Sequence, residues 1–129
     1  MTTFVCAALL TAGCGANPNG PDVSFPVTLN LKVGQTASAG GLDVTFTEVS
    51  YDWRCPINAA CISAGDAYLQ FQLSANHRTQ NYQLQVEHPD NRAGSFEGYR
   101  IEVKSLAPLP DTSRLMDKGE YKVTLMVSR

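Results

Sequence analysis

The sequence predicts an all-β protein folded as an antiparallel β-sandwich of about six to eight strands. Six segments after residue 24 alternate apolar and polar side chains with a period of two residues. No window of helical length carries an apolar stripe with a period of 3.6 residues. Because each expected strand is apolar on one face only, the six must bury those faces against a second sheet. A small barrel is the alternative.

The first two expected strands cover residues 25–33 and 42–51, with a turn-rich segment at 34–41 between them. The apolar face of the first strand carries Phe25, Val27, Leu29, Leu31 and Val33. The second strand turns Leu42, Val44 and Phe46 inward. Its alternation slips at Glu48 and Val49, which predicts a bulge or a bend at a sheet edge.

Four further strands follow at 67–74, 81–87, 99–106 and 120–128, and the first two of these are expected to form a hairpin. The alternation slips again before Leu106, and Pro108 and Pro110 then end the strand. The Tyr and Phe residues keep strict strand phase, which favours core packing over a ligand-binding aromatic lining. This series of short strands is typical of an immunoglobulin-like or Greek-key sandwich. Its inward residues are Ala67, Leu69, Phe71, Leu73, Tyr82, Leu84, Val86, Tyr99, Ile101, Val103, Tyr121, Val123, Leu125 and Val127.

Length and charge limit the possible functions. The chain has 129 residues and a net charge of −2, with Lys and Arg scattered singly. Residues 25–129 are long enough for one domain with a core of its own. Because there is no basic stripe, we expect no nucleic-acid partner.

The first residues, MTTFVCAALLTAGC, have a different character. A short apolar run ends in small residues directly before Cys14, and this resembles the lipobox of bacterial lipoprotein signal peptides. The resemblance implies that residues 1–13 are a signal peptide, truncated here because no Lys or Arg precedes the apolar run. It also implies that Cys14 is acylated and binds membrane lipid. Residues 14–24, rich in Pro and Gly, are then a flexible tether. We therefore expect an extracytoplasmic protein that is lipid-anchored to the bacterial cell envelope.

Cys55 and Cys61 lie in the stretch YDWRCPINAACISAGDA, with five residues between them. Outside the cytoplasm such a pair is expected to form a disulfide that closes a small loop. A metal site that also uses His77 and His88 is a weaker alternative, because the spacing matches no standard zinc module. Redox catalysis is a third reading, although it normally uses two intervening residues.

The run RCPINAACISAGDA resembles a signature of uncharacterised bacterial secreted proteins and lipoproteins, and the likeness covers about residues 42–129. The chain departs from that pattern at Trp53, where Ser is usual, and at Ser63, where Trp is usual. The resemblance implies an all-β extracytoplasmic domain and no assigned activity. The matching residues are Asp52, Arg54, Cys55, Pro56, Cys61, Ala64 and Gly65.

The same stretch supplies the candidate interaction residues Trp53, Arg54 and Asp66. Arg54 and Asp66 flank the two cysteines with opposite charges. They are expected to form an ion pair at the surface or within the loop, and the alternative is a small site for an anion or substrate.

No catalytic motif is recognisable, so the chain is expected not to be an enzyme and to use no cofactor. In the run Gly94-Ser95-Phe96-Glu97-Gly98 the Ser is one place away from the nucleophile-elbow position. The sequence favours a non-catalytic interaction or envelope-structural module that contacts another envelope protein or a glycan. Two alternatives stay open: a lipoprotein that binds a small ligand or metal, and a hydrolase with an unrecognised site.

Overall fold

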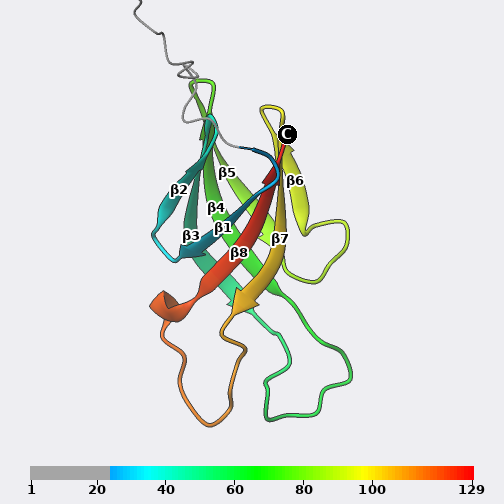
Figure 1. Ribbon diagram of the computed structural model, residues 1–129. Helices are drawn as coiled ribbons and strands as arrows, with labels where there is room; N and C mark the ends of the chain where they lie inside the picture. Colours follow the sequence, from blue (N-terminus) through cyan, green and yellow to red (C-terminus); the bar gives the residue numbers. More distant parts are fainter. Residues whose placement is uncertain (1–23) are drawn as a thin grey trace, which may run out of the picture.

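The computed structural model describes residues 24–129, which fold into two antiparallel sheets of four strands each (Figure 1). The first sheet has the order β1 (Val27–Lys32), β8 (Lys122–Ser128), β7 (Tyr99–Ala107) and β6 (Ala93–Phe96). The second has the order β2 (Thr36–Ala39), β3 (Leu42–Asp52), β4 (Ala67–Ala75) and β5 (Arg78–Gln85). A single 3-10 turn, η1 (Lys118–Glu120), precedes β8. The expected signal peptide, Cys14 and all of the tether before residue 24 lie outside the described residues.

The predicted all-β antiparallel sandwich is confirmed, and it has eight strands. Its connectivity differs from the expected Greek-key type, because strands that are hydrogen-bonded to each other also follow each other in sequence. The one exception is the pairing of β1 with β8, the first and last strands. The reason lies in the connection from β1 to β2. This connection is only three residues long. Within it, Gly34 N donates a hydrogen bond of 2.6 Å to Phe46 O on β3, so the chain turns directly from the first sheet into the second.

The core lies between the two sheets and is built from the alternating apolar faces. Both expected slips in alternation are real register shifts, one between Phe46 and Glu48 and one between Val103 and Ser105. Phe46 and Phe71, opposite each other on β3 and β4, stack with ring centroids 5.3 Å apart. The fully buried side chains are Phe46, Phe71, Leu31, Leu42, Leu69, Leu73, Ile101, Leu125, Val44, Val103, Val123 and Val127.

Two short strands lie in segments expected to be loops. Strand β2 has the sequence TASA and β6 has the sequence AGSF, so neither carries an alternating apolar face that sequence patterning detects. Each is a four-residue edge strand that forms by pairing with a longer neighbour. In β6, Gly94 lies against the Tyr82 ring, where an added Cβ would be 2.4 Å from the ring atoms.

The two ends of the sandwich differ. At one end, which we call the entry end, the described chain begins and the C-terminus lies (Figure 1). At the opposite end project two long loops: the clip loop, residues 53–66, and the return loop, residues 108–121. We call this second end the clip end. Among residues 24–129, no helix is long and apolar enough to cross a membrane.

Candidate binding site at the clip end

The clip loop is closed by the predicted Cys55–Cys61 disulfide, with the two Cα atoms 5.9 Å apart. Both sulfurs are therefore bonded to each other and are not free as metal ligands. His77 lies in the turn before β5 and His88 lies beyond its other end, so an eight-residue strand of roughly 26 Å separates them. The structure thus does not bring together the alternative metal ligands. Within residues 24–129 no group of three His, Cys, Asp or Glu residues could hold a metal ion.

Arg54 is buried at the base of the clip loop. Its guanidinium donates from Nε to Asp52 Oδ1 and from Nη2 to Asp52 Oδ2, both at 2.8 Å. Nη1 donates to Leu106 O and Nη2 donates to Pro108 O, both at 2.7 Å. The expected ion pair between Arg54 and Asp66 is therefore wrong: Asp52, at the end of β3, is the partner. Because four of its five N–H donors are occupied and it is 5% exposed, Arg54 is not a ligand-binding group.

Tyr121 completes this buried network. Tyr121 directly precedes β8, and its hydroxyl donates a hydrogen bond of 2.9 Å to Asp52 Oδ2. Burial alone would raise the pKa of Asp52, but the hydrogen bonds from Arg54 and Tyr121 outweigh it and hold that pKa below its usual 3.8. Burial, together with the hydrogen bond to Asp52, raises the pKa of Tyr121 to about 12. The network thus favours an ionised carboxylate beside a neutral phenol.

Asp66, at the other end of the clip loop, is also buried, with 6% of its surface exposed. Its carboxylate accepts from the backbone N–H groups of Ala67, Val86, Glu87 and His88 at 2.8–3.1 Å. It also accepts from Gln85 Nε2 at 3.1 Å. Asp66 therefore holds the start of the β5–β6 connection against the clip loop, and its oxygens have no capacity left for a ligand.

The clip loop is ordered by its own backbone and by the return loop. Trp53 N donates to Asp66 O and Cys55 N donates to Ala64 O, both at 2.8 Å. Ile57 N donates 2.9 Å to Pro110 O of the return loop. Asn58 adds side-chain hydrogen bonds to Asp111 and to the Thr112 backbone N–H. The two loops thus form one connected unit.

Three aromatic side chains, Tyr51, Trp53 and Tyr68, lie together where β3 enters the clip loop. We call them the aromatic ridge. The Trp53 centroid is 5.2 Å from that of Tyr51 and 4.8 Å from that of Tyr68. Tyr51 is 61% exposed, Trp53 is 37% exposed, and Tyr68 is half-buried. Of the three candidate interaction residues Trp53, Arg54 and Asp66, Trp53 is thus the accessible one.

Sequence reasoning missed Tyr51 and Tyr68 as site residues. Tyr68 shares its strand parity with the polar Gln70, and this parity indicates an outward ring. Tyr51 follows the bulge in β3, so its direction depends on a register shift. The alternation of inward and outward side chains along a strand could therefore have identified Tyr68 as an outward-facing residue, but not Tyr51.

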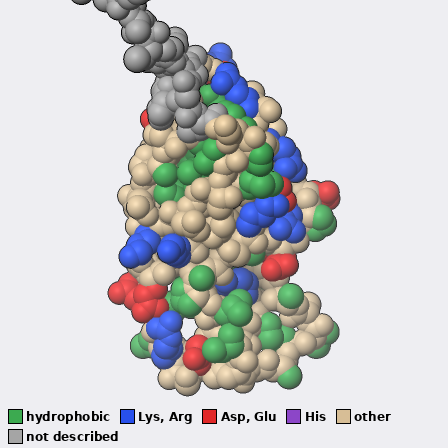
Figure 2. All heavy atoms as spheres, viewed as in Figure 1, with side chains coloured by type: hydrophobic (Ala, Val, Ile, Leu, Met, Phe, Trp, Pro, Cys, Tyr) green, Lys and Arg blue, Asp and Glu red, His purple; other side chains and the backbone are tan. Residues whose placement is uncertain are grey.

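The tips of the two loops expose large aliphatic side chains, and Figure 2 shows hydrophobic atoms gathered at this end of the molecule. They are Ile57 and Ile62 of the clip loop and Leu109 and Leu115 of the return loop. Ile62 and Leu115 are almost completely exposed. The clip loop exposes no charged side chain, because Arg54 and Asp66 are buried, whereas the return loop exposes its leucines beside the Arg114–Glu120 ion pair.

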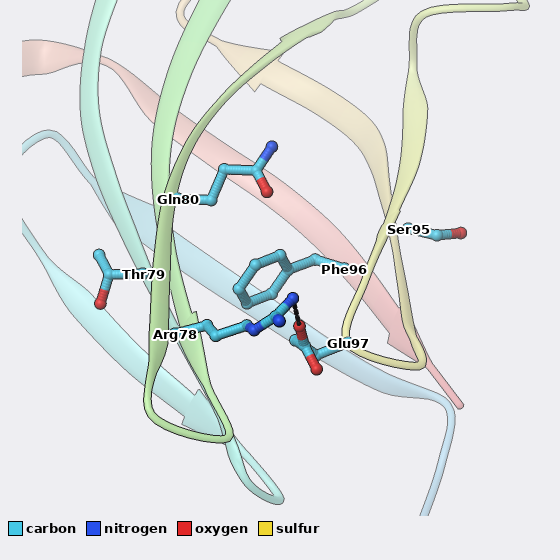
Figure 3. A pocket seen from close by; sticks show the side chains of 6 residues that line it. All are labelled: Arg78, Thr79, Gln80, Ser95, Phe96 and Glu97. Carbon is cyan, nitrogen blue, oxygen red and sulfur yellow. Dashed lines mark hydrogen bonds and ion pairs between the residues drawn. The ribbon is translucent and has the colours of Figure 1, made fainter.

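A polar hollow of about 480 Å³ lies at the seam between β5 and β6, towards the entry end (Figure 3). Phe96 points toward β5, while Ser95 points away from the hollow. Arg78 pairs across the seam with Glu97 at 3.2 Å, and the Arg78 side chain is 76% exposed. Such an exposed pair contributes at most about 1 kcal/mol, and it joins the edges of the two sheets.

No protein-family model, no curated protein and no solved structure matches this chain.

Proposed function

We propose that this chain is an exported, lipid-anchored β-sandwich that serves as a non-catalytic interaction module of the bacterial cell envelope. The observation that carries the proposal is that the entry end and the clip end lie at opposite ends of the sandwich. The described chain begins at the entry end, and the ordered clip end lies at the other end of the sandwich. An acyl anchor on Cys14 would therefore hold the entry end near the lipid and present the clip end to its surroundings.

The disulfide supports export. Cys55 and Cys61 join within a loop whose surrounding residues are largely exposed. A bond of this kind persists in an oxidising compartment and is rare in the cytoplasm. Several acyl chains would be a sufficient anchor, because each buried methylene contributes about 0.8 kcal/mol and one chain alone is marginal.

The use of the charged groups supports binding rather than catalysis. Asp52, Arg54 and Asp66 are spent on hydrogen bonds within the protein, so they are not free to move protons or hold a substrate. The accessible side chains at the clip end include the aromatic ridge and the four aliphatic loop residues, beside the exposed Arg114–Glu120 pair. Accessible aromatic and apolar surface of this kind is characteristic of recognition sites.

The intact mass of the protein, purified from the cells that make it, tests the proposal. We expect removal of the residues before Cys14, addition of acyl chains at Cys14, and a deficit of two hydrogen atoms for the disulfide. Cys14→Ser should abolish acylation and release the protein from the membrane fraction, while Cys6→Ser, the matched control, should not. An unprocessed, unacylated chain in the cytosol with all four thiols free would contradict the proposal.

A further inference from the structure

The outer face of the β2–β3–β4–β5 sheet continues from the aromatic ridge as three rows of side chains across β3, β4 and β5. Strand register places Tyr51 opposite Tyr68, Glu48 opposite Gln70 and Thr45 opposite Gln72. On β5, Gln83 lies opposite Gln70 and Asn81 lies opposite Gln72. We call the two rows beyond the ridge the amide face; its residues are Glu48, Gln70, Gln83, Thr45, Gln72 and Asn81.

The amide face is polar and almost uncharged. Glu48 is the only ionisable residue among its six members, and none of them is Lys or Arg. Gln70 Nε2 donates to Ser50 Oγ at 2.9 Å and to Gln83 Oε1 at 2.8 Å, which fixes the amides relative to one another. A hollow of about 290 Å³ opens on this face, lined by Thr47, Glu48, Ser50, Gln70, Phe71 and Asn81.

The ridge supplies the apolar part of the same surface. Tyr51 and Trp53 keep much of their area exposed, although contact between neighbouring rings already removes some of it from water. Aromatic rings of this kind offer a flat apolar face together with a polar O–H or N–H group at the edge. Rings at one end and fixed amides next to them therefore form a surface with two complementary chemistries.

We propose that the aromatic ridge and the amide face bind a neutral polysaccharide. A sugar ring has an apolar C–H face that stacks on an aromatic ring, and its hydroxyl groups both donate and accept hydrogen bonds, as carboxamides do. A polyanion is disfavoured because the surface offers no cation and carries Glu48. An aliphatic partner would bury the amide groups of Gln72 and Asn81, which lie on the same face, without supplying them with hydrogen bonds, at a free-energy cost. This inference rests on the proposed role as an interaction module and names its ligand class; it does not depend on the lipid anchor.

Trp53 is the only tryptophan of the chain, so its fluorescence reports on the ridge directly. The purified full-length protein would be titrated with three soluble neutral probes: β-glucan, galactomannan and chito-oligosaccharide. We expect a saturable change in Trp53 emission with at least one of them, and no change with the polyanion polygalacturonate. No response to any neutral probe, or a response to polygalacturonate alone, would overturn the proposal.

Two exposed single variants locate the binding surface. Tyr51→Ala should weaken binding about tenfold, because one stacking ring is lost. The matched control Leu115→Ala, at an exposed loop tip, should bind as the unaltered protein does. Equal affinity of Tyr51→Ala and the unaltered protein, or an equal loss in Leu115→Ala, would overturn the proposal.

Gln70→Ala tests the amide face and should weaken binding several-fold, with the folded state checked by thermal unfolding. Retained affinity in a folded Gln70→Ala variant would exclude the amide face from the site. Failure of glycan binding is distinguishable from failure of the proposed function, since acylation and the disulfide are read from the intact mass alone.

Discussion

The Arg54 guanidinium and the Asp52 carboxylate face each other in parallel, joined by two hydrogen bonds of 2.8 Å. Asp52 ends β3 of one sheet, while Arg54 also binds Leu106 O on β7 of the other sheet. The pair therefore joins the two sheets at the clip end. A bidentate arrangement of this kind fixes both side chains, and both are largely shielded from solvent.

Arg54→Met should lower the free energy of unfolding by about 3–5 kcal/mol, because it leaves the Asp52 carboxylate buried without its cation. Urea unfolding measures the change. The matched control is Arg114→Met, which removes the exposed pair with Glu120 and should cost at most about 1 kcal/mol. Similar losses in the two variants would contradict a special role for the buried pair.

Stability should also fall in acid through Asp52. Its pKa in the folded protein lies below 3.8, so folding favours the ionised form. The resulting stabilisation is fully present above the ordinary pKa and is lost as the pH falls through the folded pKa. Asp52→Asn lacks this group, so its free energy of unfolding should vary less with pH below about 4 than that of the unaltered protein. Urea unfolding at pH 2–7 measures both curves, and curves that stay parallel would contradict the assignment to Asp52.

The strands were predictable from the sequence because a half-buried strand leaves a period-two pattern that needs no knowledge of its neighbours. Even the bulge after Phe46 was visible as a slip of phase. Strands β2 and β6 were not predictable, because they owe their extended form to pairing with β3 and β7. The up-and-down connectivity likewise depends on which edges meet in space.

The candidate site was predictable only in part. The disulfide followed from cysteine spacing and the expected compartment, and it is present. The partner of Arg54 was not predicted, although Asp52 is only two residues away in sequence and Asp66 is twelve residues away, because the pairing depends on how the chain turns at the end of β3. Sequence also cannot reveal that Asp66 accepts from backbone groups twenty residues away, such as Val86 N.

Gly65→Ala should destabilise the protein strongly. Gly65 has a φ of +68°, and an added Cβ would lie 1.9 Å from Trp53 O, inside the backbone ladder of the clip loop. Gly34 has a φ of +84° with nothing within 4 Å of an added Cβ, so Gly34→Ala carries only the conformational cost of about 1–2 kcal/mol. We expect Gly65→Ala to cost at least about 2 kcal/mol more than this control in urea unfolding. Equal costs would show that the loop relaxes freely around residue 65.

Removing the disulfide should weaken the fold without disturbing the ridge. In Cys55→Ser/Cys61→Ser the chain-entropy model predicts a loss of about 2.4 kcal/mol for a loop of this length. The hydrogen bond from Trp53 N to Asp66 O lies at the base of the loop and stays in place. The emission of Trp53 in the folded variant should therefore match that of the unaltered protein. A shifted emission maximum in the native state would show instead that the disulfide positions the aromatic ridge.

Asp66→Ala should loosen the start of the β5–β6 connection. The carboxylate is the acceptor for Val86 N, Glu87 N and His88 N, so its removal leaves these donors without their partner. Each donor left unpaired in a buried position costs about 1–3 kcal/mol, unless the segment opens to water. Opening is the cheaper response here, since Glu87 and His88 are already exposed residues.

Amide hydrogen exchange should therefore accelerate at residues 86–88 by at least tenfold, while the β7 and β8 amides keep their protection. Asp66→Asn retains one acceptor oxygen, so its exchange rate at residues 86–88 should lie between those of the unaltered protein and of Asp66→Ala. If exchange at 86–88 stayed unchanged in Asp66→Ala, ordered water would have replaced the carboxylate, and the segment would owe its conformation to the bonds between Gln85 and Asn91 instead.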